Sequence, residues 1–214
     1  MKLASLFNWF REKKSPVAKV FTEIYQQNIW DCSETRSGPG SSLARTEVIR
    51  RELPALLAEL QITSLLDAPC GDLNWLAGIA LPVRRYVGVD VVAPLIAENR
   101  RWFGTRARKF LVADFIRATL PRHAAILCRD GLIHLPNAEV LLSLKNFQRS
   151  GATFLLATTH SLIEENVDIP TGAWRSVNLQ LPPFSLPPPL RHIVENPTTG
   201  KLLGVWRLAE LKFP

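Results

Sequence analysis

The chain of 214 residues has only three cysteines and four histidines. Cys32, Cys70 and Cys128 are an odd number and lie far apart in sequence, which argues against a disulfide framework and against the short Cys-x-x-Cys spacing of a zinc site. The histidines are isolated as well, and none forms the close pair that a metal-binding helix carries. We therefore expect a reducing, cytoplasmic environment and no metal.

Long apolar runs are also missing. No stretch reaches the roughly 18 residues that a membrane-spanning helix requires. Near the N-terminus, Leu3, Leu6, Phe7 and Phe10 recur at helical spacing, but no small-residue cleavage site follows them, as it would in a signal peptide. We interpret this segment as a retained amphipathic helix, which packs on the domain or lies on a lipid surface.

The overall composition is that of a globular protein, with 47% hydrophobic and 21% charged residues. The formal net charge of +7 leaves a nucleic-acid partner open but does not favour it over a small molecule, because net charge reports on steering more than on identity. Basic residues are densest over residues 100–109, where they are mixed with two aromatic residues, Trp102 and Phe103. This run fits the solvated end of a helix, and it also resembles some nucleic-acid surfaces.

From residue 62 onward, short apolar runs alternate with amphipathic segments. Strands are expected at Ser64–Asp67, Arg85–Asp90, Lys109–Asp114, Ala124–Asp130 and Thr153–Thr159, and helices at Asp72–Ile79, Ala93–Phe103 and Asn137–Arg149. Strands that are apolar almost throughout belong to a parallel sheet covered on both faces. The predicted fold class is α/β, with a doubly wound, mostly parallel sheet in residues 62–214, preceded by N-terminal helices and a cap loop in residues 1–61.

The flanking segments carry their own signals. Ser33–Ser42 is rich in glycine, serine and proline, so we interpret it as a linker or a cap. A helix is expected over Leu43–Leu60, which Pro54 kinks or divides. Near the C-terminus, Trp174–Leu179 and Leu203–Leu211 are expected to form a terminal antiparallel pair, separated by an ordered proline-rich loop.

Aspartates close four of the expected strands: Asp67, Asp90, Asp114 and Asp130. Open α/β sheets bind ligands beside the carboxyl ends of their strands, so these side chains are expected around one ligand. Beyond Asp67, the glycine at position 71 lets the backbone approach that ligand closely. Asp90 stands about twenty residues downstream, where nucleotide sites place the acid that holds a ribose. The pattern therefore predicts a nucleoside site.

Four segments carry a family resemblance: Leu65–Asp72, Gly88–Asp90, Ala113–Phe115 and Cys128–Leu135. Together they resemble the motifs of class I S-adenosylmethionine-dependent methyltransferases over about residues 62–211, and the segment 36–42 looks like a loop of a bacterial subgroup. The resemblance implies a Rossmann-like enzyme with S-adenosylmethionine as cofactor and S-adenosylhomocysteine as product. The first motif departs from the family, because Ala68 and Cys70 replace two of its usual glycines.

The resemblance also implies roles for individual residues. The turn from Asp67 to Gly71 would hold the methionine moiety, Asp90 the ribose hydroxyls and Asp114 the adenine amino group, with Phe115 beside the ring. The full set of cofactor-binding residues implied is Asp67, Ala68, Cys70, Gly71, Asp72, Asp90, Val91, Asp114, Phe115 and Arg129.

For the chemistry, His134 is the candidate general base, because an imidazole titrates near neutrality, and Asp130 stands just before it. The acceptor is expected to be an oxygen or nitrogen atom of a small molecule that the sequence does not identify. The candidate substrate contacts, chosen by position in the chain, are Arg36, His160, Asn166, Arg175 and Asn178.

Two alternatives remain open. A nicotinamide-dependent oxidoreductase also uses a strand, a turn, a helix and an acid, but its G-x-G-x-x-G pattern is missing after the first expected strand. A non-catalytic nucleoside-binding or interaction module would keep the same fold, since fold does not determine function.

Overall fold

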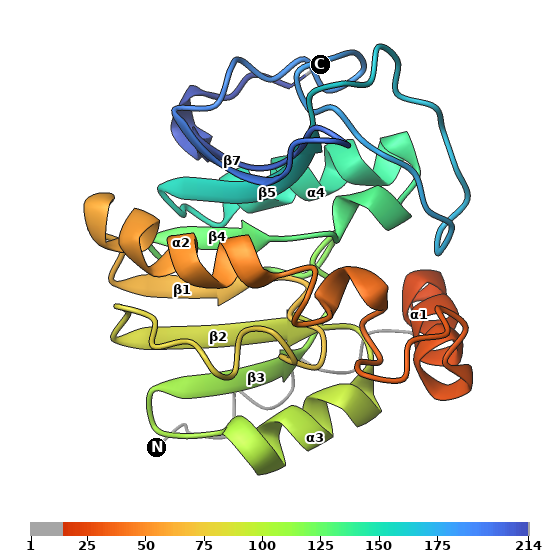
Figure 1. Cartoon of the computed structure of the whole chain (residues 1–214), viewed down its shortest axis with the longest axis vertical. Helices are drawn as coiled ribbons and strands as arrows, with labels where there is room; N and C mark the ends of the chain where they lie inside the picture. Colours follow the sequence, from red (N-terminus) through yellow and green to blue (C-terminus); the bar gives the residue numbers. More distant parts are fainter. Residues whose placement is uncertain (1–14, 214) are drawn as a thin grey trace, which may run out of the picture.

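The computed structural model describes residues 15–213, so the amphipathic segment expected over residues 3–10 lies outside the described residues. The described chain forms one seven-stranded sheet in the order β3-β2-β1-β4-β5-β7-β6 (Figure 1). Strands β1 to β5 run parallel, whereas β7 is antiparallel to β5 and β6 is antiparallel to β7. The strands are β1 (Ser64–Asp67), β2 (Arg85–Asp90), β3 (Arg108–Val112), β4 (Ala125–Cys128), β5 (Phe154–His160), β6 (Arg191–Asn196) and β7 (Lys201–Arg207).

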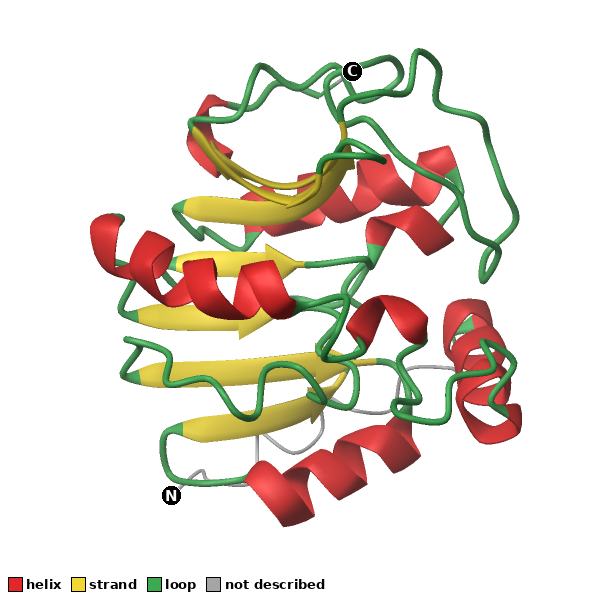
Figure 2. Ribbon diagram, in the orientation of Figure 1, coloured by secondary structure: helices red, strands yellow, loops and turns green. Residues whose placement is uncertain are grey.

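Helices cover both faces of this sheet (Figure 2). The α-helices are α1 (Pro16–Gln27), α2 (Glu47–Glu59), α3 (Ala93–Phe103) and α4 (Asn137–Arg149), and the short 3₁₀ helices are η2 (Pro39–Ser41), η3 (Leu132–His134) and η4 (Leu208–Glu210). Residues of α2 and α3 share one hydrophobic core cluster, and residues of α4 belong to the other. The predicted α/β fold class is confirmed.

The apolar character of β5 shows why the sheet must be covered twice. All seven of its residues are buried. Because successive side chains of a strand point to opposite faces, Leu155 enters the core cluster beneath α4 while Leu156 enters the cluster beneath α2. A strand with this pattern is stable only between two layers of helices.

Several expected elements match the structure closely. Strands β1 and β2 and helices α3 and α4 have the predicted bounds, and β3, β4 and β5 are displaced by one or two residues at their ends. Helix α2 is shorter than expected but continuous, with Pro54 inside it. Ile49, Leu53, Leu56 and Leu57 all bury one face of α2, and this packing holds the helix together across the hydrogen bond that proline cannot make.

The helix expected over Asp72–Ile79 is absent, and turns occupy the segment instead. Leu73 has a φ of 60°, in the left-handed region that an α-helix does not tolerate. The Asp72 carboxylate bonds the backbone of Asn74 and three groups of the loop at 35–37, which fixes the turn from outside the segment. A tertiary contact thus overrides the helical pattern.

The terminal hairpin forms, but with a different partner. Strand β7 covers the first part of the expected Leu203–Leu211 strand, and β6 pairs with it, whereas Trp174–Leu179 is not a strand. The 174–179 segment crosses the end of β5, where the Val177 carbonyl accepts from the His160 N–H and the Leu179 N–H donates to Thr159. Its alternation of apolar residues reflects burial of Val177 and Leu179 in the core beside α4.

The carboxyl ends of β1 to β4 all lie at one edge of the sheet, and α1 lies beyond this edge (Figure 1). Strand β1 pairs with β2 on one side and with β4 on the other. This reversal of strand order opens a crevice in doubly wound sheets. None of the helices within residues 15–213 combines the length and the hydropathy needed to cross a bilayer.

The double burial of β5 predicts a large effect of truncation. Leu155→Ala should lower the free energy of unfolding by about 2–5 kcal/mol, since a fully buried leucine leaves a cavity behind. Leu142→Ala is the matched control, because Leu142 on α4 is 46% exposed and should cost less than about 0.5 kcal/mol. Urea denaturation measures both values, and equal losses in the two variants would contradict this account of the sheet.

Candidate active site

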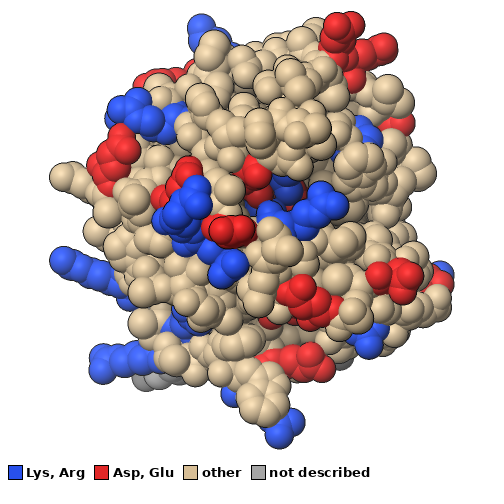
Figure 3. All heavy atoms as spheres, in the orientation of Figure 1, with Lys and Arg blue, Asp and Glu red and all other residues tan. Residues whose placement is uncertain are grey.

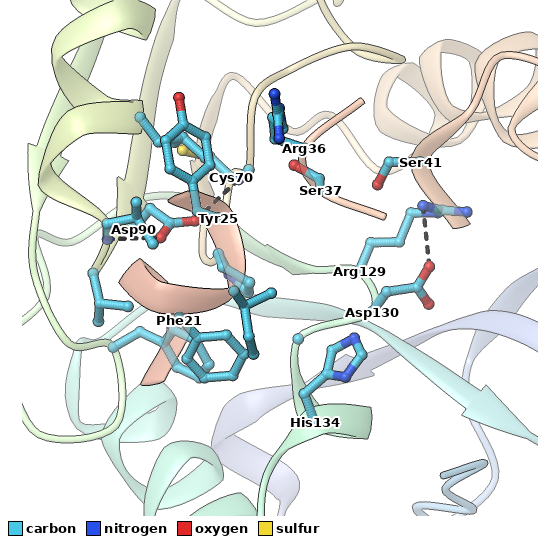
Figure 4. Close-up of a pocket in the computed structure, with 18 of the residues that line it drawn as sticks. Phe21, Tyr25, Arg36, Ser37, Ser41, Cys70, Asp90, Arg129, Asp130 and His134 are labelled. Atoms are coloured by element: carbon cyan, nitrogen blue, oxygen red, sulfur yellow. Dashed lines mark hydrogen bonds and ion pairs between the residues drawn. The ribbon is translucent and has the colours of Figure 1, made fainter. Parts of the chain in front are cut away.

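A cavity opens at the carboxyl edge of the sheet, over the crevice between β1 and β4. Its walls come from the ends of β1 to β4, from helix α1 and from the segment 30–41 (Figure 4). Residues far apart in the sequence therefore surround one space. The sequence-predicted residues that line it are Arg36, Asp67, Cys70, Gly71, Asp90, Val91, Asp114, Phe115, Arg129, Asp130 and His134.

The turn after β1 brings the backbone close to the cavity. Gly71 has a φ of 55°, and a Cβ atom added there would overlap the Ser37 hydroxyl, so this position requires glycine. The Gly71 N–H donates to Asp90 (3.2 Å) and the Gly71 carbonyl accepts from Asn99 of α3 (2.7 Å). The turn is thus held from β2 and α3 at the same time.

Two buried carboxylates stand on either side of this turn. Burial raises the pKa of Asp67 to about 7, although the Tyr86 hydroxyl, which donates to it at 2.6 Å, opposes the shift. Burial likewise raises the pKa of Asp90 to about 6, although the backbone N–H groups of Val92 and Gly71, which donate to it, oppose the shift. Each carboxylate has lone pairs left for a hydroxyl or an ammonium group of a ligand.

The third strand end carries Asp114 and Phe115. One oxygen of Asp114 accepts from the Ile116 N–H (2.9 Å), and the other accepts from the hydroxyl of Ser15, the residue just before α1 (2.8 Å). Phe115 lies 7% exposed in the cavity wall and stacks on Phe147 of α4, with ring centroids 5.6 Å apart. This corner of the cavity offers a carboxylate acceptor beside an apolar ring.

A cap loop, defined here as residues 34–43, closes the cavity from above. Asp72 accepts from the Thr35 hydroxyl and the Arg36 N–H, both at 2.7 Å, and from the Ser37 hydroxyl. Asp72 is therefore a structural anchor of the cap loop and does not line the cavity, and neither does Ala68. The cap loop in turn brings Ser37 and Ser41 into the wall.

Arg129, at the end of β4, is the centre of a buried charge network. Its side chain is 3% exposed, and it donates two hydrogen bonds to Glu195 Oε2, from Nη2 at 2.6 Å and from Nε at 3.0 Å. Nη2 also donates to the Gly40 carbonyl of the cap loop (3.0 Å). Burial alone would lower the pKa of Arg129, but Asp130 and Glu195 raise it above its ordinary value.

Asp130 completes this network from the cavity side (Figure 4). It accepts from Lys201 Nζ (2.6 Å) and from the Thr158 hydroxyl (3.1 Å), and it pairs with Arg129 (3.2 Å). Burial alone would raise the pKa of Asp130, but the two cations bring it well below its ordinary value. A carboxylate held ionised in this way positions its neighbours and is a poor proton acceptor.

His134 has a defined tautomer. Its Nδ1 lies 2.9 Å from the Ala173 carbonyl, which can only accept, so Nδ1 carries the proton and Nε2 keeps its lone pair. The ring stacks on Trp30 with centroids 4.7 Å apart. Burial lowers the pKa of His134 below 6.5, so the imidazole is neutral at pH 7. His134 thus presents an available base in the cavity wall.

Four of the candidate substrate contacts lie away from the cavity. His160 bonds the backbone of Val177, and the Asn166 side chain donates to the Asn178 carbonyl and accepts from the Asn178 N–H. The Asn178 side chain bonds the backbone of residues 163 and 180. The Arg175 guanidinium donates to backbone carbonyls of residues 132, 135 and 167. These side chains hold the segment 166–178 against the sheet, and only Arg36 of the candidate substrate contacts lines the cavity.

The aromatic wall is the part of the site that sequence reasoning missed. Phe21 and Tyr25 of α1 line the cavity together with Trp30. Helical spacing of Val17, Phe21 and Ile24 was a usable signal for a helix with one apolar face. Nothing local, however, indicated that this face covers the strand ends.

Several of the solved structures that superpose on this chain are methyltransferases by name. The chain has the class I methyltransferase fold. It superposes on TnmH with a TM-score of 0.58 and 20% identity, over 77% of this chain and 55% of that one, so it spans about half the length of TnmH.

Other structures with this methyltransferase fold agree. The bacterial CtHen1 methyltransferase domain superposes with a TM-score of 0.57 and 12% identity, over 78% of this chain and 100% of that one. Magnesium protoporphyrin IX methyltransferase from Synechocystis PCC 6803, solved with bound SAM, gives 0.51 and 13% over 74% and 82%. No protein-family model matches the chain, and no curated protein matches it in sequence.

The raised pKa of Asp67 makes stability depend on pH. The folded chain binds this proton up to about pH 7 and the unfolded chain only up to about pH 4, so folding stability falls as the pH rises between these values. Asp67→Asn removes this loss. Relative to the parent protein, the variant should gain on the order of 2–4 kcal/mol between about pH 4 and pH 8.

Thermal unfolding monitored by circular dichroism at several pH values measures this difference. Tyr86→Phe is the companion variant, since it removes the hydrogen bond that opposes the shift and should extend the loss of stability to higher pH. A difference between Asp67→Asn and the parent that stays constant with pH would contradict the assignment.

Proposed function

We propose that this protein is an S-adenosylmethionine-dependent methyltransferase that methylates an oxygen or nitrogen atom of a small-molecule acceptor. The observation that carries the proposal is the convergence of four strand ends on one cavity. Gly71, Asp90 and Asp114 line it together, although they come from three different strand ends. The class I fold supports the same reading.

The residues present fit the cofactor. The carboxylates of Asp67 and Asp90, whose pKa values burial raises, suit an ammonium group and a ribose diol. Asp114 suits the amino group of adenine, with Phe115 against the ring. Gly71, in the cavity wall, offers backbone against which the methionine end would lie. When bound, the cofactor would supply an electrophilic methyl group.

The rest of the cavity suits the acceptor. Phe21 and Trp30 of the aromatic wall lie against His134, and Ser37 and Ser41 add hydroxyls from the cap loop. These walls orient an acceptor and exclude water, which is most of what a displacement at a methyl group requires. Because α1 and the cap loop enclose this space, it suits a small-molecule acceptor. Arg36, exposed at the same wall, suits a negatively charged substituent.

Within this proposal His134 is the general base. The Ala173 carbonyl holds the proton on Nδ1, and Nε2 takes the proton of the acceptor hydroxyl or amine as the methyl bond forms. Asp130 is a positioning residue, since Lys201, Arg129 and Thr158 occupy its oxygens.

Cofactor binding is tested by calorimetric titration with S-adenosylhomocysteine, S-adenosylmethionine and NAD. We expect both adenosyl compounds to bind, and Asp90→Ala to weaken binding at least about 10-fold to 100-fold, since it removes charge-assisted hydrogen bonds. Asp114→Ala should also weaken binding, and it leaves the hydrogen bond between the Gly71 N–H and Asp90 in place. Asp31→Ala, in an exposed residue, is the control. NAD binding alone would favour an oxidoreductase, and no binding of any of the three would overturn the proposal.

The role of His134 is tested by His134→Asn, whose amide can still donate to the Ala173 carbonyl. Once an acceptor is found by transfer of a labelled methyl group, kcat should fall about 10²-fold to 10⁴-fold while the affinity for S-adenosylhomocysteine stays unchanged. Because burial lowers the pKa of His134, kcat of the parent should be constant through neutral pH and decline only below pH 6.5. His160→Asn is the matched control, and an equal fall in that variant would remove His134 from catalysis.

A further inference from the structure

Charge is distributed unevenly between the two edges of the sheet. Aspartates gather at the carboxyl edge around the cavity, whereas the loops that lead into β1, β2, β3 and β4 lie at the opposite, amino edge. Those loops, residues 60–63, 78–84, 104–107 and 118–124, contain Arg84, Arg106 and Arg122 but no aspartate or glutamate.

The first residues of β2 and β3 and the last turn of α3 add further basic residues at this edge. We define the basic edge as Arg84, Arg85, Arg100, Arg101, Arg106, Arg108 and Lys109. All except Arg108, which is half-buried, are exposed. Within residues 15–213, none of the seven takes part in an ion pair with an acidic side chain. In Figure 3, extended Lys or Arg side chains stand out at the lower left, where Figure 1 places the amino ends of β2 and β3.

The basic edge is hollowed and not flat. A groove runs between the end of α3 and the start of β3, lined by Arg100, Thr105, Arg108 and Lys109 with apolar floor residues. Arg100 Nε donates to the Phe110 carbonyl at 2.9 Å, which fixes the arginine along the groove and leaves its terminal nitrogens for a ligand. Basic side chains that have no acidic partner and lie along a groove are suited to a chain of phosphates.

An aromatic platform stands at the same end of α3 as the groove. Trp102, on the last turn of α3, is 68% exposed, and it is the most exposed large hydrophobic side chain of the described chain. The guanidinium of Arg101 lies 4.9 Å from the centre of its ring. A solvent-exposed indole next to arginines offers a face on which a nucleobase stacks, and such stacking tolerates any base.

We propose that the basic edge binds single-stranded nucleic acid, with phosphates along the groove and a base stacked on Trp102. An acidic protein segment would satisfy the cations but would leave the Trp102 platform unused, and a duplex has no unstacked base to offer. The surface lies at the edge of the sheet opposite the cavity, so it docks a strand and does not present it as the methyl acceptor. The inference is independent of the proposed function.

The test is fluorescence anisotropy with the full chain and a labelled single strand of about 20 nucleotides, both as RNA and as DNA, at several salt concentrations. The triple variant Arg84→Gln/Arg106→Gln/Lys109→Gln removes three bases from the basic edge. Its matched control, Arg45→Gln/Arg51→Gln/Lys212→Gln, removes the same charge from exposed positions elsewhere. Thermal unfolding checks that both triples fold like the parent.

We expect the affinity of the basic-edge triple to fall at least about 30-fold at low salt, and that of the control less than about threefold. The slope of log affinity against log salt should become shallower by about 2 in the basic-edge triple, as expected for three lost phosphate contacts. Trp102→Ala should cost about 10-fold for single strands and leave duplex binding unchanged.

Three results would overturn the proposal. Equal losses in the two triples would show that net charge alone attracts the strand. Duplex binding as tight as single-strand binding, with no effect of Trp102→Ala, would remove the stacking platform. Polyglutamate or inorganic polyphosphate that binds the basic edge as tightly as the oligonucleotide would show that it recognises anions without regard to bases.

Discussion

The guanidinium of Arg129 is the constraint on which the site depends. It is nearly inaccessible to water, so its charge and donors must be matched within the protein. The partners come from β6, from the cap loop and from the residue next to it: Glu195, Gly40 and Asp130. Removing one partner of a buried ion pair typically costs about 3–5 kcal/mol. The C-terminal hairpin and the cap loop are therefore energetically tied to the end of β4.

The opposite side of the cavity contains two carboxylates whose charged forms are disfavoured by burial. Asp67 and Asp90 are buried carboxylates that form no ion pair within residues 15–213, and burial raises the pKa of both. A polar group without full compensation is tolerated in a protein interior where a ligand can supply what is missing. One wall of the cavity thus contains Arg129, whose charge is balanced within the protein. The other wall contains two carboxylates that a ligand can balance.

Local sequence patterns predicted the parts of the fold that local physics decides. Strand β2 and helix α3 follow from an apolar run and from amphipathic spacing, and both have the predicted bounds. The turn at Leu73 could not be predicted, since Asp72 holds it through contacts with residues more than thirty positions upstream. The strand-end acids, by contrast, could be placed at the cavity from sequence, because the carboxyl ends of parallel strands meet at one edge of the sheet. The α1 wall could not, because periodicity reveals an apolar face but not what it covers.

The separation of acids and bases along the strands has a consequence for the whole molecule. At the cavity edge Arg129 and Lys201 balance Asp130, whereas no acidic side chain within residues 15–213 pairs with the bases of the basic edge, so uncompensated positive charge is concentrated at the amino ends of the strands. In the field of any polyanion such an uneven distribution gives a torque as well as an attraction. The molecule would approach a negatively charged polymer with α3 and the amino ends of the strands leading. The mouth beneath α1 and the cap loop would then face away from the polymer, open to diffusing molecules.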